Sequence, residues 1–237
     1  MSYELSVLIT AAASIGFFHT LFGPDHYLPF IVISRAGEWS LRKTILVTFL
    51  CGIGHVLSSV LLGMLGILLG IAVSKLEAFE SFRGGIAAWL LIVFGLLYFV
   101  WGVQRAWRNK PHKHFHIHED GVKHVHHHVH TKDHVHVHEA EGSRNFTPWI
   151  LFIIFVFGPC EPLIPLLMYP ASRNSLHGLI LVTLIFSVVT IATMVSIVMI
   201  STLGINFLPV KRLERYTHAI AGATIFLSGM AIQFLGL

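Results

Sequence analysis

Charged residues are scarce in this chain. Asp, Glu, Lys and Arg make up 12% of its 237 residues, whereas 54% of the residues are hydrophobic and the mean hydropathy is +0.73. Soluble domains carry about 25% charged residues, so this composition excludes an ordinary soluble domain and predicts a protein that lies in a lipid bilayer. A transmembrane helix needs about 20 apolar residues. Six stretches are long enough, at roughly 3–33, 42–73, 82–107, 147–170, 176–203 and 212–236.

The chain also has few cysteines, and it has no recognisable catalytic or nucleotide-binding motif. The two cysteines, Cys51 and Cys160, are too few for a disulfide framework. The sequence has no phosphate-binding loop of the form G-x4-G-K-[ST], so the chain by itself is not expected to use ATP. It has no H-E-x-x-H or nucleophile motif, and we expect no enzyme activity. The net charge of +4 gives no reason to expect nucleic acid as a partner.

A short sequence phrase occurs twice inside the apolar stretches. Residues 22–29 have the sequence FGPDHYLP, and residues 157–165 have the sequence FGPCEPLIP. Gly-Pro disfavours a continuous helix, so each copy predicts a helix break within a membrane span. Many secondary transporters build their substrate site near the bilayer midplane from paired broken helices. We therefore expect the functional site at these two breaks.

The repeated phrase divides the chain into two halves. Residues 1–108 and 147–237 each hold three of the expected spans, and residues 109–146 form a loop between them. The third span also resembles the sixth, because Gly95 matches Gly229 at a spacing of 134 residues. Three spans are an odd number, so the second half enters the membrane in the opposite orientation. The sequence predicts an all-α integral membrane protein with six transmembrane helices, arranged as two inverted three-helix repeats whose first and fourth helices are broken.

Lys and Arg are distributed unevenly among the expected loops. If the N-terminus faces outside, the inside loops hold 13 of the 16 basic residues and the outside loops hold 3. Basic residues are enriched in cytoplasmic loops. We therefore predict a multi-pass protein of the cell membrane, with both termini outside and the central loop in the cytoplasm.

Several ionisable side chains lie within the expected spans. Each costs about 2.5–3.5 kcal/mol at the bilayer centre on insertion scales, so it points to a function or a partner. In a straight helix His19 and His26 would lie about 10 Å apart along the axis, but a break at Gly23 can bring them together. Imidazole combined with carboxylate or thiolate favours a late first-row divalent cation. The residues expected to bind such a metal ion are His19, Asp25, His26, His55, Cys160 and Glu161.

Two of these residues have alternative structural roles. His55 can supply a ligand across a close helix contact, or it can hydrogen-bond to Ser58, Ser59 or a carbonyl group. Glu161 can be a ligand, or it can only pair with His26. The sequence leaves both alternatives open.

The motif H-x5-D-H, formed by His19, Asp25 and His26, resembles the first-half signature of nickel/cobalt transporters of the NiCoT/NicO type, within the LysE-like transporter superfamily. The usual spacing in that family is H-x4-D-H. The resemblance implies a polytopic fold, histidine-rich loops and transport of Ni2+ or Co2+, with these three residues at the metal site. The G-P-C-E-P segment around Cys160 resembles the proline-flanked cysteine of thiol–disulfide transmembrane relays in the same superfamily.

The loop between the two halves is rich in histidine. Residues 112–138 hold 12 of the 17 histidines, mostly at even-numbered positions that alternate with apolar residues. This alternation is the period of a β-strand and Asp120-Gly121 is typical of a hairpin turn, so a small β-meander and a disordered metal-binding tract both fit. The histidines expected to form this accessory metal site are His112, His114, His116, His118, His124, His126, His128, His130, His134, His136 and His138.

The leading hypothesis is a secondary transporter for a divalent transition-metal cation, Ni2+ or Co2+ first and Zn2+ next, carried through the site at the helix breaks. Proton coupling fits this site, with Asp25, His26 or Glu161 exchanging protons for metal. We expect no prosthetic group and make no prediction of the oligomeric state. The alternatives are a thiol–disulfide electron relay that uses Cys160 and Cys51, and an exporter of a small, sulfite-like anion.

Overall fold

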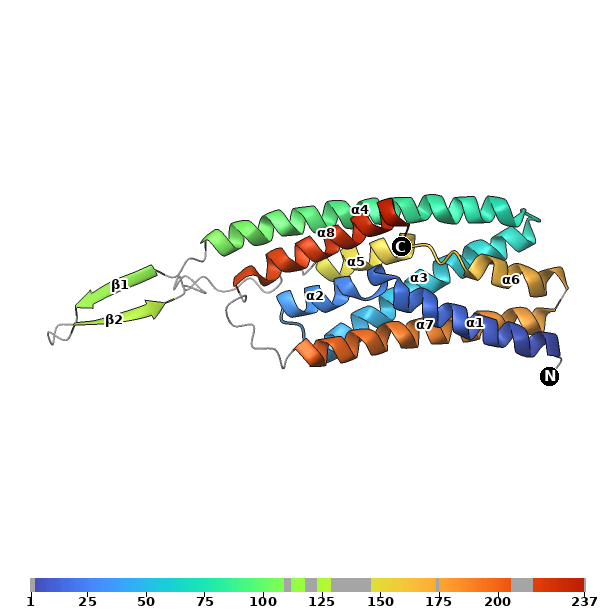
Figure 1. The fold of residues 1–237 in the computed structure, drawn as a ribbon, viewed down its shortest axis with the longest axis horizontal. Coiled ribbons are helices and arrows are strands. Elements are labelled where there is room, and N and C mark those ends of the chain that lie inside the picture. The colour runs from blue at the N-terminus through green and yellow to red at the C-terminus, as the bar shows by residue number, and fades with distance from the viewer. Residues whose placement is uncertain are drawn as a thin grey trace.

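The computed structural model describes residues 3–108, 112–117, 123–128, 146–173, 175–205 and 215–236. Most of these residues belong to a bundle of long helices that run roughly along one direction (Figure 1). The helices are α1 (Tyr3–Phe22), α2 (Leu28–Ala36), α3 (Leu41–Leu68), α4 (Val73–Arg108), α5 (Thr147–Phe157), α6 (Leu163–Ser172), α7 (Leu176–Ile205) and α8 (Thr217–Leu235). A short 3-10 helix, η1 (Pro24–His26), lies between α1 and α2.

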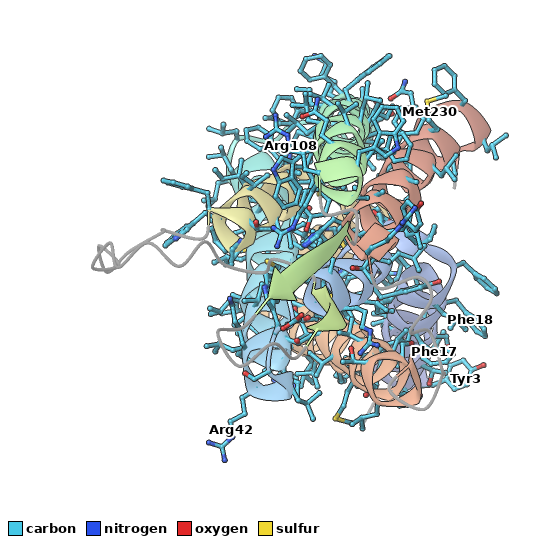
Figure 2. All side chains as sticks on the ribbon, turned by 90° about the vertical axis from the view of Figure 1, so that its left-hand side faces the viewer. Tyr3, Phe17, Phe18, Arg42, Arg108 and Met230 are labelled. Carbon is cyan, nitrogen blue, oxygen red and sulfur yellow. The ribbon has the colours of Figure 1, made fainter. Side chains whose placement is uncertain are left out.

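Five helices in the described part of the chain, α1, α3, α4, α7 and α8, are long and apolar enough to cross a membrane. Large apolar side chains cover the outside of the bundle, and Figure 2 shows Phe17 and Phe18 projecting from it. The prediction of an all-helical membrane protein is therefore confirmed at this level. The expected fourth span, 147–170, is divided at Gly158 into α5 and α6, each too short to cross a bilayer alone.

The histidine-rich loop contains an antiparallel hairpin of β1 (His112–Ile117) and β2 (Lys123–His128). Its register places even-numbered histidines opposite one another in the pairs His112–His128, His114–His126 and His116–His124. The expected turn at Asp120-Gly121 lies outside the described residues. So do the remaining histidines that the sequence assigns to an accessory metal site, namely His118, His130, His134, His136 and His138.

α4 begins at Val73, not near residue 82 as hydropathy predicts. The charges of Glu80 and Arg83 lower the hydropathy of this stretch, so an apolar window places the boundary too late. In the structure the two side chains form an ion pair at 2.5 Å, so neither charge has to face lipid. Arg83, which is one of the three basic residues counted in the expected outside loops, is therefore a buried residue of a long helix.

α4 and α8 lie side by side, and glycines let their backbones approach closely (Figure 1). A Cβ atom on Gly95 would lie 2.3 Å from the backbone nitrogen of Phe226. One on Gly222 would lie 2.2 Å from the backbone nitrogen of Phe99. Small residues permit such contacts between membrane helices. Gly229, which the sequence comparison of the third and sixth expected spans aligns with Gly95, lies in the same contact.

α3 passes both halves of the divided fourth span, because it contacts α5 and α6 as well as α7. Two of its buried residues, Cys51 and Val56, belong to different hydrophobic clusters. One cluster contains Cys51, Phe30 and Phe155. The other contains Val56 and Cys160. The middle of α3 thus lies at the boundary between the two clusters. This boundary is next to both helix breaks.

Candidate functional site

The first helix break brings two histidines together. α1 ends at Phe22, η1 follows it, and α2 begins at Leu28. Pro24 has no N–H group and restricts the residue before it, so the α-helical hydrogen bonding stops here. The ring centroids of His19 and His26 are 4.8 Å apart, whereas a straight helix would separate the two residues by about 10 Å along its axis.

His55 of α3 completes a cluster of three histidines. The Nε2 atoms of His26 and His55 lie 3.3 Å apart, and both side chains are buried. One ring nitrogen from each of His19, His26 and His55 lies within 4.8 Å of the other two. The Nε2 atom of His19 is buried and has no hydrogen-bond partner among the described residues. Three imidazoles at this spacing could share one metal ion.

The ring of His55 faces this cluster and not the nearby serines. The Ser58 hydroxyl donates to the backbone carbonyl of His55 at 2.8 Å. The Ser59 hydroxyl donates to a carboxylate of α4. The ring also hydrogen-bonds to the backbone carbonyl of Phe155, so the structure shows parts of both roles that the sequence leaves open for His55.

Asp25 lies on the opposite side of the His26 ring from His55. Its Oδ1 atom is 3.1 Å from the Nδ1 atom of His26, while Nε2 of the same ring faces His55. A carboxylate in this position orients an imidazole and selects which nitrogen carries the proton. Asp25 therefore contacts the cluster only through His26, whose ring it orients.

A cavity of about 930 Å³ lies between the two helix breaks. Asp25 and His26 line it from the first break, and Pro159 and Glu161 line it from the second. The described residues that line it include both carboxylates but no Lys or Arg. Residues of both Gly-Pro breaks therefore share one cavity, and the described residues that line it give a small anion no Lys or Arg side chain.

Two charged residues of α4 hold the second helix break. The carboxylate of Glu80 accepts a hydrogen bond from the N–H of Cys160 at 3.1 Å. Arg83 forms an ion pair with Glu80 and donates to the carbonyl oxygens of Val156 at 2.9 Å and Gly158 at 3.4 Å. A helix end leaves such backbone groups without partners within the helix. Side chains of α4 therefore complete the hydrogen bonding that the break in the fourth span interrupts.

The two cysteines do not lie close together. The N–H of Cys160 also donates to the Ser59 hydroxyl at 3.2 Å, so Cys160 lies beside that turn of α3. Cys51 precedes Ser59 by eight residues on the same helix, which corresponds to about 12 Å. A disulfide needs Cα atoms within about 7 Å. Both cysteines are free and buried, and the expected pair does not meet in this structure.

Glu161 and Cys160 lie apart from the histidine cluster. Glu161 is exposed where it lines the cavity, and within the described residues His26 pairs with Asp25 instead. Cys160 is fully buried and is not part of the three-histidine group. The assignment of individual residues as metal ligands stays a prediction.

Sequence reasoning missed Glu80 and Arg83. An acidic and a basic residue three positions apart share one face of a helix, which is the one signal that could have identified them. Their partners Val156 and Gly158 are more than 70 residues away in the chain, so no local pattern indicates the contact.

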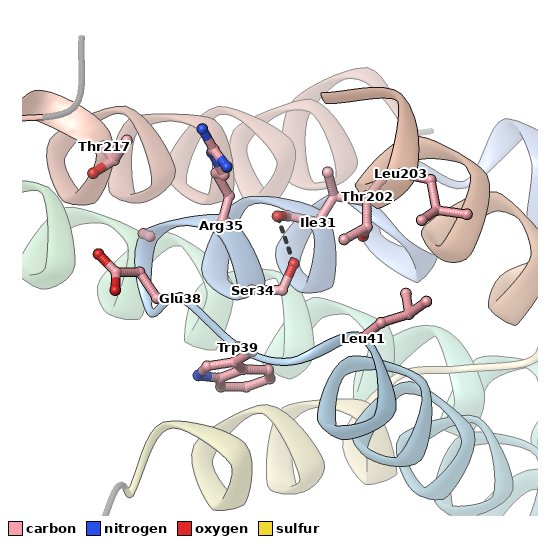
Figure 3. A pocket seen from close by; sticks show the side chains of 10 residues that line it. Ile31, Ser34, Arg35, Glu38, Trp39, Leu41, Thr202, Leu203 and Thr217 are labelled. Carbon is pink, nitrogen blue, oxygen red and sulfur yellow. Dashed lines mark hydrogen bonds between the residues drawn. The ribbon is translucent and has the colours of Figure 1, made fainter. Parts of the chain in front are cut away.

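A second cavity, of about 370 Å³, lies at the end of α2. Figure 3 shows Arg35, Glu38 and Trp39 around it, together with Thr202 of α7. Residues 206–214, which follow α7 in the chain, lie outside the described residues.

The chain matches the family model described as cytochrome C biogenesis protein transmembrane region, over residues 29–231. No curated protein and no solved structure matches it. The match overturns the resemblance to nickel/cobalt transporters, so the prediction of a metal-binding protein that transports nickel or cobalt is wrong. The match includes Cys160 but begins after His26, and so excludes the short motif that carries the resemblance. Because the match covers most of its length, the chain belongs to the family of cytochrome c biogenesis protein transmembrane regions.

Proposed function

We propose that the protein is a thiol–disulfide relay that passes reducing equivalents across the membrane, with Cys160 as its exchange residue. The observation that supports this function is the family match, which includes Cys160 at the break of the fourth span. Cytochromes c attach haem through the cysteines of a C-x-x-C-H motif, and those thiols have to be reduced to react. Where maturation takes place in an oxidising compartment, the reductant comes through the membrane.

The proposed exchange proceeds through mixed disulfides. The Cys160 thiolate attacks the disulfide of an oxidised partner protein, which forms a mixed disulfide and releases one thiol of that partner. A dithiol protein from the other side attacks Cys160, which releases the partner's second thiol. The second thiol of the dithiol protein then displaces Cys160 and closes its own disulfide. Two electrons and two protons pass from the dithiol protein to the oxidised partner, and Cys160 is regenerated.

This scheme uses Cys160 without Cys51. The separation of about two helical turns between Cys51 and the turn of α3 that bonds Cys160 argues against a disulfide between them. Cys51 packs among Phe30 and Phe155, away from the cavity that the two breaks line. The alternative of an anion exporter receives no support from that cavity, whose charged lining residues are carboxylates.

We predict that Cys160→Ser reduces transmembrane thiol exchange to the rate of protein-free liposomes, whereas Cys51→Ser retains the parent rate. Serine cannot form a mixed disulfide, and Cys51 takes no part in the proposed exchange. The assay encloses reduced thioredoxin in liposomes that contain the protein. It then measures the free thiols that form on a disulfide-bonded C-x-x-C-H peptide outside.

Two outcomes of this assay separate the alternatives. Exchange that persists in Cys160→Ser overturns the relay. Loss of exchange in both variants shows that Cys51 and Cys160 act as a pair, which requires a second conformation of α3. The variant Asp25→Ala serves as a reference at the first break, because Asp25 is not a thiol and its loss leaves Cys160 in place.

The proposed architecture has six membrane crossings. α1 with α2 and α5 with α6 each form one broken span, and the four other long helices supply the rest. The two Gly-Pro breaks and the contact of α4 with α8 support an inverted repeat. Both termini lie outside and residues 109–146 lie in the cytoplasm, as the 13 to 3 distribution of basic residues favours.

This orientation predicts the result of limited proteolysis. Trypsin added outside sealed, right-side-out vesicles is expected to leave residues 109–146 uncut, although this segment contains Lys123, Lys132 and Arg144. In inverted vesicles the same protease should cut there. Cleavage in right-side-out vesicles alone would reverse the proposed orientation.

A further inference from the structure

A buried polar network, separate from the histidine cluster, surrounds Cys160. Glu80 has no exposed surface and Arg83 is 8% exposed, although both belong to a membrane helix. Beyond their own ion pair, the two side chains bond to α3 and to the segment between α5 and α6. Arg83 donates to the Ser58 hydroxyl at 2.7 Å, and Glu80 accepts from the Ser59 hydroxyl at 3.1 Å. A charged side chain within a membrane costs free energy, so it usually has a functional or structural role.

The bonds of the pair are concentrated on the backbone of one short segment. Arg83 binds the carbonyl oxygens of Val156 and Gly158, which lie at the C-terminal end of α5. A guanidinium group is favoured there, because the helix dipole is negative at its C-terminus. Glu80 binds the N–H of Cys160 two residues later. The two side chains thus hold the segment 156–160 from both sides of Pro159.

The shape of α4 also fits this segment. A Cβ atom on Gly84 would lie 2.8 Å from Cγ of Pro159, so glycine makes room for the proline ring. Gly84 follows Glu80 by one helical turn and lies on the same face of α4. By contrast, a Cβ atom on the neighbouring Gly85 would meet nothing within 4 Å. One face of α4 therefore contacts the break in two ways. Glu80 and Arg83 hydrogen-bond to its backbone, and Gly84 leaves space for the Pro159 ring.

We propose that Glu80 and Arg83 form a clamp that keeps the segment 156–160 against α4 and Cys160 out of reach of other thiols. The thiol of Cys160 is accessible only when this segment leaves α4. Glu80 and Arg83 are positioning residues, since they act on Cys160 through the backbone around it. The use of the released thiol for exchange rests on the proposed function, whereas the clamp itself does not.

The reaction of Cys160 with N-ethylmaleimide in detergent-solubilised protein tests the clamp. In the double variant Glu80→Gln/Arg83→Met both charges are removed together, so no charge is left buried alone. The bonds of Arg83 to Val156 and Gly158 are lost. We expect Cys160 to react about ten to a hundred times faster than in the parent protein, the change that corresponds to loss of one or two charge-assisted hydrogen bonds.

Cys51 is an internal reference in the same experiment. It is 1% exposed and lies in the other hydrophobic cluster, away from the clamp. Release of the segment 156–160 raises the reaction rate of Cys160 alone, whereas general unfolding raises the rates of both cysteines. A faster reaction at both cysteines, or at neither, would overturn the proposal.

Gly84→Ala tests the same clamp without a change of charge. The added methyl group meets the Pro159 ring and is expected to weaken the contact of the segment with α4, so that Cys160 reacts several times faster. Gly85→Ala is the matched control and should leave the rate unchanged. Equal rates in the two alanine variants, with a slow Cys160 in the double variant, would exclude the clamp. Neither result depends on relay activity, so failure of the clamp and failure of the relay are distinguishable.

Discussion

Arg83→Met alone is expected to lower the free energy of unfolding by about 3–5 kcal/mol, because it leaves the carboxylate of Glu80 buried without a positive partner. Glu80 is fully buried, and its other partners, the N–H of Cys160 and the hydroxyl of Ser59, are neutral. Removal of one member of a buried ion pair costs more than removal of both, since the remaining charge keeps its desolvation penalty. Denaturant unfolding in detergent micelles, followed by tryptophan fluorescence, measures the change.

The double variant Glu80→Gln/Arg83→Met is the control for this prediction. It removes the uncompensated charge, while the amide oxygen of the new glutamine can still accept the hydrogen bond of Cys160. The double variant should therefore recover more than half of the lost stability. The interaction energy from the complete double-mutant cycle separates the pair from the other contacts of each residue. If Arg83→Met were as stable as the parent protein, Glu80 would not need Arg83 as a counter-charge.

The positions of the two helix breaks could be predicted from the sequence alone. Proline removes a backbone donor and clashes with the preceding turn wherever it lies inside a helix, so its effect is local. α1 therefore ends before Pro24, and α5 ends before Pro159. The approach of His19 to His26 follows from the first of these breaks.

The partners of the second break could not be predicted in this way. Hydropathy treats Glu80 and Arg83 as two separate costs, because an average over a window does not include their attraction. Only the folded bundle brings Arg83 to Gly158, 75 residues away in the chain, and Glu80 to Cys160. The same limit applies to the cysteines, since the sequence does not reveal that Cys51 and Cys160 belong to different clusters.

The family could not be identified from a motif of three residues. His19, Asp25 and His26 have the residue types of a metal site, and the structure brings the two histidines together. These positions precede residues 29–231, the region that matches the family model. A short polar motif at a helix break reports local chemistry, whereas the family is defined by the pattern of the whole membrane domain.

Gly95→Leu is expected to destabilise the protein by about 3 kcal/mol, because the new side chain would have to occupy the contact between α4 and α8. Its Cβ atom would lie 2.3 Å from the backbone nitrogen of Phe226 and 2.7 Å from its Cα atom. Backbone atoms of a packed helix cannot rotate away as a flexible side chain can, so the two helices have to separate. The lower denaturant midpoint in micelles measures this cost.

Gly85→Leu on the same helix provides the matched control. A Cβ atom at this position meets nothing within 4 Å, and the position lines the cavity of about 930 Å³, which leaves room for a leucine side chain. The substitution should be neutral or slightly stabilising, because leucine favours a helix more than glycine does by several tenths of a kcal/mol. Equal loss of stability in both variants would mean that α4 tolerates no larger residue anywhere. If only Gly95→Leu loses stability, the close approach of α4 and α8 contributes to the stability of the fold. These two helices belong to different halves of the chain.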